Sequence, residues 1–142
     1  LGATLTSLDA LLAQSDFISL HCLLNEQTHH LLGREALAKV KPGVMIVNDS
    51  RGPLIDEAAL VEALQDGRVW AAGLDVTERE PLPADSPLLE LDNVILTPHT
   101  AAYSPQSREA LYAQICEISI DVIQGRVPQF LVNPTVLAHL RR

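Results

Sequence analysis

Residues 47–60, "VNDSRGPLIDEAAL", decide the fold because they join an apolar run to a segment with helical spacing. The apolar run, "VMIVN" (44–48), is typical of a strand buried in a parallel sheet. The segment "EAALVEALQ" (57–65) repeats its apolar residues at helical spacing, and Asp56 is placed to cap it. We therefore predict a strand, a short connection and a helix in immediate succession.

The connection in this unit carries one cation, Arg51, followed by Gly52 and Pro53. An arginine at the end of a buried strand can be interpreted in two ways. It can be a solvated loop residue, or it can present its planar guanidinium to an anion such as a carboxylate. The rest of the chain has to decide between these interpretations.

Strand and helix patterns alternate on both sides of this unit. Strands are predicted at "FISLHC" (17–22), "VWAAGLDV" (69–76) and "VILT" (94–97), and a helix at "REALAKV" (34–40). Alternation with short connections predicts an α/β fold, in which a parallel sheet has helices on both faces. This is the doubly wound, or Rossmann-type, architecture.

Polar or titratable residues stand where four of the predicted strands end. They are His21, Asn48 to Arg51, Asp75, and Thr97 to His99. In a doubly wound sheet, ligands bind in the crevice outside the carboxyl ends of the strands. We therefore expect a binding or catalytic site at this edge of the sheet.

Composition narrows the class of protein. The chain has 142 residues, 47% of them hydrophobic, which is enough for one ordinary globular core. Its formal net charge of −8 argues against a nucleic-acid or membrane-surface partner, which would need clustered Lys and Arg. Cys22 and Cys116 lie far apart and suggest buried thiols in a reducing compartment. Because no apolar run reaches the roughly 20 residues of a membrane span, we expect a soluble cytoplasmic protein.

The candidate residues suit one kind of chemistry. Reduction of a 2-keto acid needs a bidentate cation for the carboxylate, a proton donor for the keto oxygen and a hydride source. Histidine suits the proton transfer, and a neighbouring carboxylate favours its protonated form. At or just beyond the predicted strand ends the chain offers Arg51, His99 and two acidic candidates, Asp75 and Glu80.

Three ordered motifs resemble one family. "VKPGVMIVNDSRGPLIDEAALVEAL" (40–64), "AAGLDVTEREP" (71–81) and "TPHTAAYS" (97–104), with these separations, are similar to the D-isomer-specific 2-hydroxyacid dehydrogenases. Within that family, "DFISLHCLLNEQTHHL" (16–31) and "GRVPQFLVNP" (125–134) most resemble the C-terminal-binding-protein branch. The resemblance covers essentially the whole chain, and it implies an NAD-dependent oxidoreductase that moves hydride between nicotinamide and C2 of a 2-hydroxy or 2-keto acid.

The resemblance also implies a role for individual residues. Arg51 matches the arginine that binds the substrate carboxylate and carbonyl, and His99 matches the general acid and base. Glu80 matches the carboxylate paired with that histidine, and Asp75 matches the residue that holds the nicotinamide end of the cofactor. The cofactor-binding residues implied in this way are Cys22, Leu23, Asn25, Asp49, Ser50, Arg51, Asp75 and His99.

The resemblance further implies how the chain is organised. Residues 1–102 correspond to the C-terminal part of the dinucleotide-binding domain, the second half of the doubly wound sheet. Residues 103–142 correspond to a crossover helix, predicted from Ser104-Pro105 to Gly125, and a tail that returns to a substrate domain. The family's glycine-rich phosphate turn is not in this sequence, and the only methionine is Met45. We therefore expect a portion of a longer protein, inactive in isolation, whose complete form is a homodimer.

The sequence departs from the family pattern in two places and leaves alternatives open. Asp49-Ser50 replaces the family's common threonine-alanine, and an inward-pointing Asp49 would weaken anion binding at Arg51. An aromatic residue common in the C-terminal-binding-protein branch is missing near Ala102, which enlarges the expected pocket. Because that branch includes corepressors, an NAD(H)-sensing interaction protein is the alternative function. Finally, His21, Cys22, His29 and His30 fit no standard zinc spacing, so no metal site is expected.

Overall fold

A computed structural model describes residues 2–139 of the chain. The chain folds into two compact units, one ending at Ala101 and the other beginning at Ala102. The first unit holds all of the candidate site residues named above. The second contains the predicted crossover helix.

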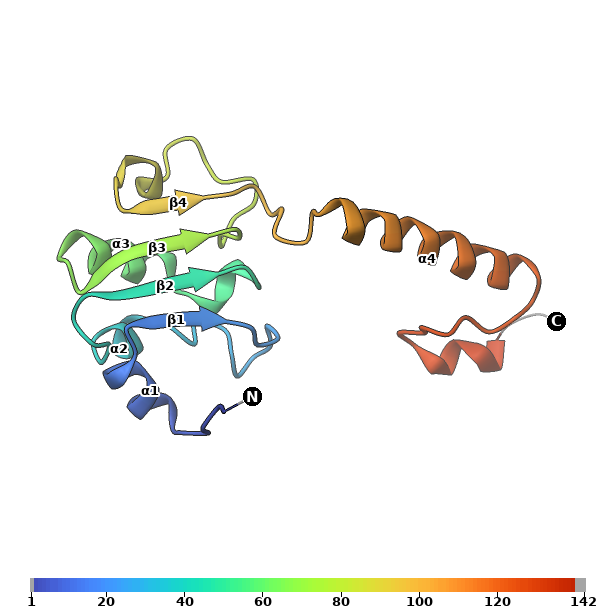
Figure 1. Ribbon diagram of the computed structural model, residues 1–142, viewed down its shortest axis with the longest axis horizontal. Helices are drawn as coiled ribbons and strands as arrows, with labels where there is room; N and C mark the ends of the chain where they lie inside the picture. The colour runs from blue at the N-terminus through green and yellow to red at the C-terminus, as the bar shows by residue number, and fades with distance from the viewer. Residues whose placement is uncertain (1, 140–142) are drawn as a thin grey trace. The chain divides into compact units, whose positions relative to one another are not determined.

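The first unit is built on a four-stranded parallel sheet (Figure 1). Its strands are β1 (Phe17–Leu20), β2 (Val44–Asn48), β3 (Val69–Leu74) and β4 (Val94–Leu96), and they lie in the order β1-β2-β3-β4. Every neighbouring pair is parallel, so all four carboxyl ends meet at one edge of the sheet. The predicted α/β fold class and the four predicted strands are confirmed.

Helices cover one face of this sheet. They are α1 (Leu8–Gln14), α2 (Arg34–Leu37) and α3 (Glu57–Gln65), with single 3₁₀ turns η1 (Gly52–Leu54) and η2 (Pro87–Glu90). α3 packs on β3, α2 packs on α3, and α1 packs on α2. Their buried side chains form one hydrophobic core with the strand residues that face them.

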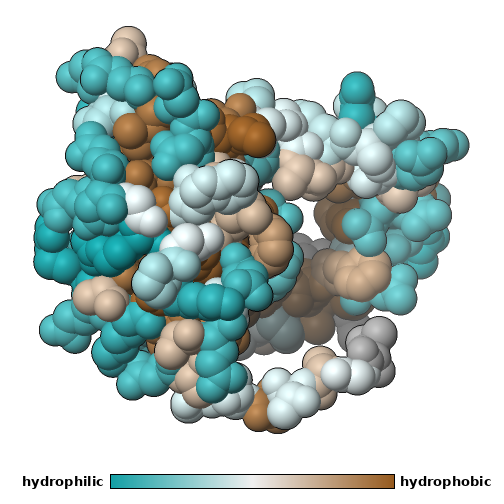
Figure 2. Space-filling view, turned by 60° about the vertical axis from the view of Figure 1, so that its left-hand side comes forward, coloured by the Kyte–Doolittle hydropathy of each residue, from teal (hydrophilic) through white to brown (hydrophobic). Residues whose placement is uncertain are grey.

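The opposite face of the sheet is open within residues 2–101. Phe17, Val47 and Ile95 point to it and are 67%, 41% and 73% exposed. We expected helices on both faces, and the strand order explains the difference. Right-handed connections place every helix on the same side when successive strands advance in one direction, and only a reversal of strand order brings helices to the other side. The face of the molecule seen in Figure 2 carries hydrophobic patches among hydrophilic residues.

α3 begins at the residue predicted to cap it. The Asp56 carboxylate accepts a hydrogen bond of 3.0 Å from the backbone N–H of Ala59. Replacing Asp56 by alanine should lower the free energy of unfolding by about 1 kcal/mol, because an N–H of the first turn loses its partner. Urea denaturation measures this effect. Asp56→Ser retains a capping oxygen and should lose much less, and equal losses for the two variants would contradict the capping role.

The second unit consists of α4 (Pro105–Ile123) and the 3₁₀ segment η3 (Pro134–His139). As predicted, Ser104 caps α4, and its hydroxyl accepts a bond of 3.0 Å from the N–H of Ser107. The described residues of α4 include no buried side chain, and Cys116 is exposed, so the prediction of a buried thiol there is wrong. Its apolar residues follow helical spacing, and among the described residues most of them are exposed, including Leu111, Ile115 and Val122. Among the described residues, no helix is long and apolar enough to cross a membrane.

Candidate active site

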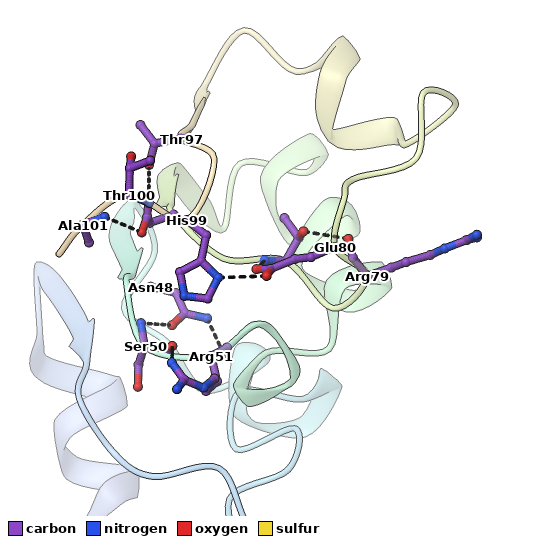
Figure 3. A network of polar contacts seen from close by, with 11 residues as sticks. Asn48, Ser50, Arg51, Arg79, Glu80, Thr97, His99, Thr100 and Ala101 are labelled. Carbon is purple, nitrogen blue, oxygen red and sulfur yellow. Dashed lines mark hydrogen bonds and ion pairs between the residues drawn. The ribbon is translucent and has the colours of Figure 1, made fainter. Parts of the chain in front are cut away.

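The site lies at the carboxyl edge of the sheet, where Glu80 and His99 form a hydrogen-bonded pair. The Nδ1 atom of His99 lies 2.9 Å from Oε2 of Glu80 (Figure 3). The other oxygen of Glu80 accepts a bond of 3.1 Å from the backbone N–H of Thr77. The bond from His99 holds the pKa of the Glu80 carboxyl below its usual value, burial works in the opposite direction, and the Thr77 N–H lowers it further. Glu80 is therefore a carboxylate whose charge faces the imidazole.

His99 adopts an unusual backbone conformation. Its φ is +54°, in the left-handed region, where a non-glycine residue costs about 1 to 3 kcal/mol. Its backbone N–H donates to the carbonyl of Asp75 over 2.9 Å, which ties the turn that carries it to the end of β3. Strain of this kind persists only where the surrounding contacts impose it, and it is concentrated at functional sites.

Those contacts come from Asp75, which is 8% exposed. Its Oδ1 accepts bonds from the Thr97 hydroxyl and the Thr100 N–H, and its Oδ2 accepts one from the Ala101 N–H. Burial alone would raise the pKa of the Asp75 carboxyl, but these three hydrogen bonds outweigh it and lower the pKa. A carboxylate has about four acceptor positions, so about one remains for a ligand. The observed role of Asp75 is to hold the His99 turn.

Arg51 stands at the end of β2, in a turn shaped by a buried asparagine. Asn48 is 1% exposed, and its side-chain amide donates to the carbonyl of Arg51 and accepts from the N–H of Ser50. The guanidinium of Arg51 donates to the carbonyl of Ser50 over 2.7 Å, and the residue is exposed. Figure 3 shows the His99 ring directed toward Glu80, with the Arg51 turn at the same edge of the sheet. The three predicted catalytic residues are thus brought to one region from three separate connections.

The loop after β1 reaches the same turn. The Ser50 hydroxyl donates to the carbonyl of Cys22 over 3.0 Å. The Thr28 hydroxyl donates to the carbonyl of Leu23, and the Asn25 side chain accepts from the N–H groups of Gln27 and Thr28. These bonds give the loop a fixed shape, with the Leu23 side chain exposed. The predicted cofactor-side residues of this loop therefore lie next to the Arg51 turn.

The Asp49 carboxylate lies beside the imidazole of His21. Its Oδ1 lies 3.7 Å from Nδ1 of His21, whose Nε2 is 2.8 Å from the hydroxyl of Ser19. We expected an inward-pointing Asp49 to weaken anion binding at Arg51. The observed position places its charge beside His21, and among the described residues no ion pair joins Asp49 to Arg51.

An apolar pocket of about 420 Å³ opens beside the His99–Glu80 pair. Leu82, Leu89 and Leu96 line it together with the two paired residues. The side chain of His99 is 51% exposed, so its imidazole remains accessible to a ligand that enters from this side. The pocket therefore suits a group that exchanges a proton.

Gly52 and Thr77 are not among the site residues predicted from the sequence. Gly52 is buried, and the carbonyl of Thr77 lies directly against it. Thr77 also supplies the N–H that holds Glu80. The only sequence signal was the glycine that follows Arg51, because a glycine can mark a close approach between two backbones.

A parallel α/β sheet whose carboxyl edge carries such a site is the architecture of dinucleotide-binding proteins. Residues 1–101 match the profile of the "D-isomer specific 2-hydroxyacid dehydrogenase, NAD binding domain". The chain belongs to the D-isomer specific 2-hydroxyacid dehydrogenase family. The predicted family and cofactor class are confirmed by this match.

Relatives of known name agree with the family. The chain is 48% identical over 136 residues to a glyoxylate/hydroxypyruvate reductase B of Yersinia pseudotuberculosis, covering 96% of this chain and 42% of the relative. It resembles the crystal structure of the TT0316 protein from Thermus thermophilus, with a TM-score of 0.89 and 42% identity over 94% of this chain and 42% of that one. It also resembles D-lactate dehydrogenase with NAD+ from Lactobacillus jensenii, with a TM-score of 0.83 and 32% identity over 90% and 42%.

The chain thus spans about two fifths of the length of these relatives. None of the three is named as a C-terminal-binding protein, so the closeness to that branch stays a prediction.

Proposed function

We propose that this chain forms the catalytic edge of the NAD-binding domain in an NAD-dependent D-2-hydroxyacid dehydrogenase. The observation that carries the proposal is the His99–Glu80 pair, bonded at 2.9 Å and lying beside the Arg51 turn. The names of the relatives, which are glyoxylate/hydroxypyruvate reductase and D-lactate dehydrogenase, support a small 2-hydroxy or 2-keto acid as the substrate.

Each residue has one task in the proposed reaction. Arg51 binds the substrate carboxylate through its planar guanidinium, which fixes the position of C2. His99 delivers a proton to the keto oxygen during reduction and removes it from the hydroxyl during oxidation. Glu80 orients the imidazole and places a negative charge beside its Nδ1 atom. The cofactor, when bound, supplies or accepts the hydride.

The chain's own residues fit the nicotinamide end of the cofactor. Asp75 keeps about one free acceptor position, which suits an amide N–H group. Cys22, Leu23 and Asn25 come from the loop after β1, and Asp49 and Ser50 precede the arginine. We assign these residues to the cofactor side of the site, and Arg51 and His99 to its boundary with the substrate.

The remaining features of the proposal concern the whole protein. Residues 1–102 would form the C-terminal part of a dinucleotide-binding domain. Residues 103–142 would return to a substrate domain, and that domain would cover the apolar side chains of α4. We propose a homodimer, as the resemblance implies. Free thiols at Cys22 and Cys116 support a location in the reducing cytoplasm.

Substitution of Arg51 tests this function in an active whole protein that contains the chain. Arg51→Ala should lower kcat/KM for a 2-keto acid roughly 10- to 150-fold, mainly through KM, because charge-assisted hydrogen bonds to the carboxylate are lost. Steady-state kinetics with glyoxylate, hydroxypyruvate and pyruvate measure the effect. Arg51→Lys, which keeps the charge but not the planar fork, should recover only part of the loss.

Arg51→Ala also distinguishes between the two candidate functions, a dehydrogenase and an NAD(H)-sensing assembly protein. An assembly protein would show no 2-keto acid turnover, and its Arg51→Ala variant would still bind its partners when the cofactor is present. Unchanged kcat/KM in an active Arg51→Ala enzyme would contradict the assigned anchor.

A further inference from the structure

We propose that Gly52 and Thr77 are positioning residues that join the Arg51 turn to the Glu80 turn. Their contact sets the separation between the carboxylate anchor and the proton-transfer pair. The catalytic meaning of this inference rests on the proposed function, whereas the contact itself does not.

The contact is a close approach of two backbones. A Cβ atom placed on Gly52 would lie 1.9 Å from the carbonyl oxygen of Thr77, 2.1 Å from its carbonyl carbon and 2.6 Å from the N of Glu78. Real Cβ atoms stay beyond 3.0 Å from such neighbours. All three atoms are backbone, so no side-chain rotation can make room. Gly52 is required here by space and not by a left-handed conformation.

Gly52 follows Arg51 directly and opens η1, which is otherwise well anchored. Leu54 in the same turn is completely buried, and Pro53 accepts a hydrogen bond of 2.8 Å at its carbonyl from the N–H of His30. Because η1 is held by the core, a clash at Gly52 cannot be relieved by moving η1 alone. The turn that starts at Thr77 has to move as well.

That turn positions Glu80 by three bonds. The Thr77 N–H donates to Oε1 of Glu80 over 3.1 Å, and the Thr77 hydroxyl donates to the carbonyl of Arg79 over 2.9 Å. The N–H of Glu78 donates to the Glu57 carboxylate at the start of α3 over 3.2 Å. Glu80 is thus tied to Thr77 on one oxygen and to His99 on the other. If Thr77 moves, the Glu80 carboxylate moves with it, and the bond between Glu80 and His99 is disturbed.

The size of the shift sets the expected effect. Moving the Thr77 carbonyl from 1.9 Å to 3.0 Å from an added methyl group displaces the turn by about 1.1 Å. A misplacement of about 1 Å at a catalytic group can lower the rate on the order of 100-fold. Gly52→Ala should therefore affect both Arg51 and Glu80, although it removes no functional side chain.

The first test uses the 142-residue chain and needs no activity. NMR titration of the ¹³C-labelled Glu80 carboxyl should show its pKa rising toward the usual value in Gly52→Ala, because the bonds from His99 and Thr77 are weakened. Gly73→Ala is the matched control, since its added Cβ has only an ordinary contact, 3.9 Å from Cγ2 of Val47. A folded Gly52→Ala variant whose Glu80 titration equals that of wild type overturns the proposal.

A second pair of variants decides the matter if Gly52→Ala does not fold. Thr77→Val keeps the shape of the side chain but loses the hydroxyl bond to Arg79, and it should also raise the pKa of Glu80. Thr77→Ser restores the hydroxyl and should recover the wild-type titration. If Thr77→Val titrates like wild type, Thr77 does not position Glu80 through this bond and the proposal fails.

Kinetics of an active whole protein separate this inference from the proposed function. Gly52→Ala should raise KM and lower kcat together, about 100-fold in kcat/KM, whereas Arg51→Ala acts mainly on KM. If the whole protein reduces no 2-keto acid, the proposed function fails, but the Glu80 titration still tests the contact. If it is active and Gly52→Ala has wild-type kinetics and titration, the positioning role is excluded.

Discussion

Replacing His99 by glutamine is expected to lower kcat for 2-keto acid reduction roughly 10²- to 10⁴-fold, the contribution typical of a positioned general acid. Glutamine can still hydrogen-bond to a keto oxygen, but it cannot release a proton to it. The KM should change much less, because Arg51 and not His99 binds the carboxylate in the proposed mechanism. Steady-state kinetics of the active whole protein, with binding of the cofactor measured separately, test this.

Comparing Glu80→Gln with His99→Gln shows how much the Glu80 carboxylate contributes to the action of the His99–Glu80 pair. It retains the imidazole but removes the negative charge 2.9 Å from Nδ1, so its kcat should fall less than that of His99→Gln. The double variant should be no slower than His99→Gln alone, because the two residues act as one unit. A His99→Gln enzyme that keeps wild-type kcat would remove His99 from the mechanism.

The second large effect concerns stability: Asp75→Asn should lower the free energy of unfolding by about 3 kcal/mol. The carboxylate accepts three hydrogen bonds, from Thr97, Thr100 and Ala101. An asparagine keeps one acceptor oxygen and points an NH₂ group at a backbone donor, so two donors face each other and at least one part-buried bond is lost. Thr97→Val removes only the hydroxyl bond and should cost about 1 kcal/mol. Urea denaturation of both variants distinguishes these values.

The free energy of unfolding that is lost in Asp75→Asn should depend on pH. The pKa of Asp75 is lowered in the folded state, so its stabilising contribution is complete above the ordinary value of about 3.9. It is lost as the pH falls through the lower, folded-state pKa. The difference between wild type and Asp75→Asn should thus be constant above about pH 5 and should narrow in stronger acid. A difference that grows on acidification would contradict the assigned bonds.

The loss of His99 and the loss of the Asp75 carboxylate both act on the turn that carries His99. His99 holds a φ of +54° because the N–H groups on its C-terminal side are bonded to Asp75. In the Asp75→Asn variant, the strain at His99 is no longer balanced by those bonds. We therefore expect the carboxylate of Asp75 to be needed for the geometry of the His99–Glu80 pair.

Apolar spacing and capping residues were sufficient to predict where the main strands and helix α3 form. The strands at 44–48 and 69–74, and helix α3 with its Asp56 cap, form where apolar spacing and capping residues predict them. Such features depend on neighbours within a few residues, so they are readable in order along the chain. The order and spacing of the motifs around Arg51, Glu80 and His99 were also sufficient to identify the family, which the comparison with known proteins confirms.

The tertiary structure decided what depends on contacts between distant segments. The order β1-β2-β3-β4, which leaves one sheet face open, follows from pairing between residues about 22 to 28 positions apart, and not from the composition of the strands. The bonds of Asp75 to the His99 turn and the close approach of Gly52 to Thr77 likewise join residues about 25 apart. The order of residues along the chain is enough to show which chemical groups are present and which local element carries each. Only the folded chain determined which of them touch, because an aspartate or a glycine has the same local pattern whatever it meets across the sheet edge.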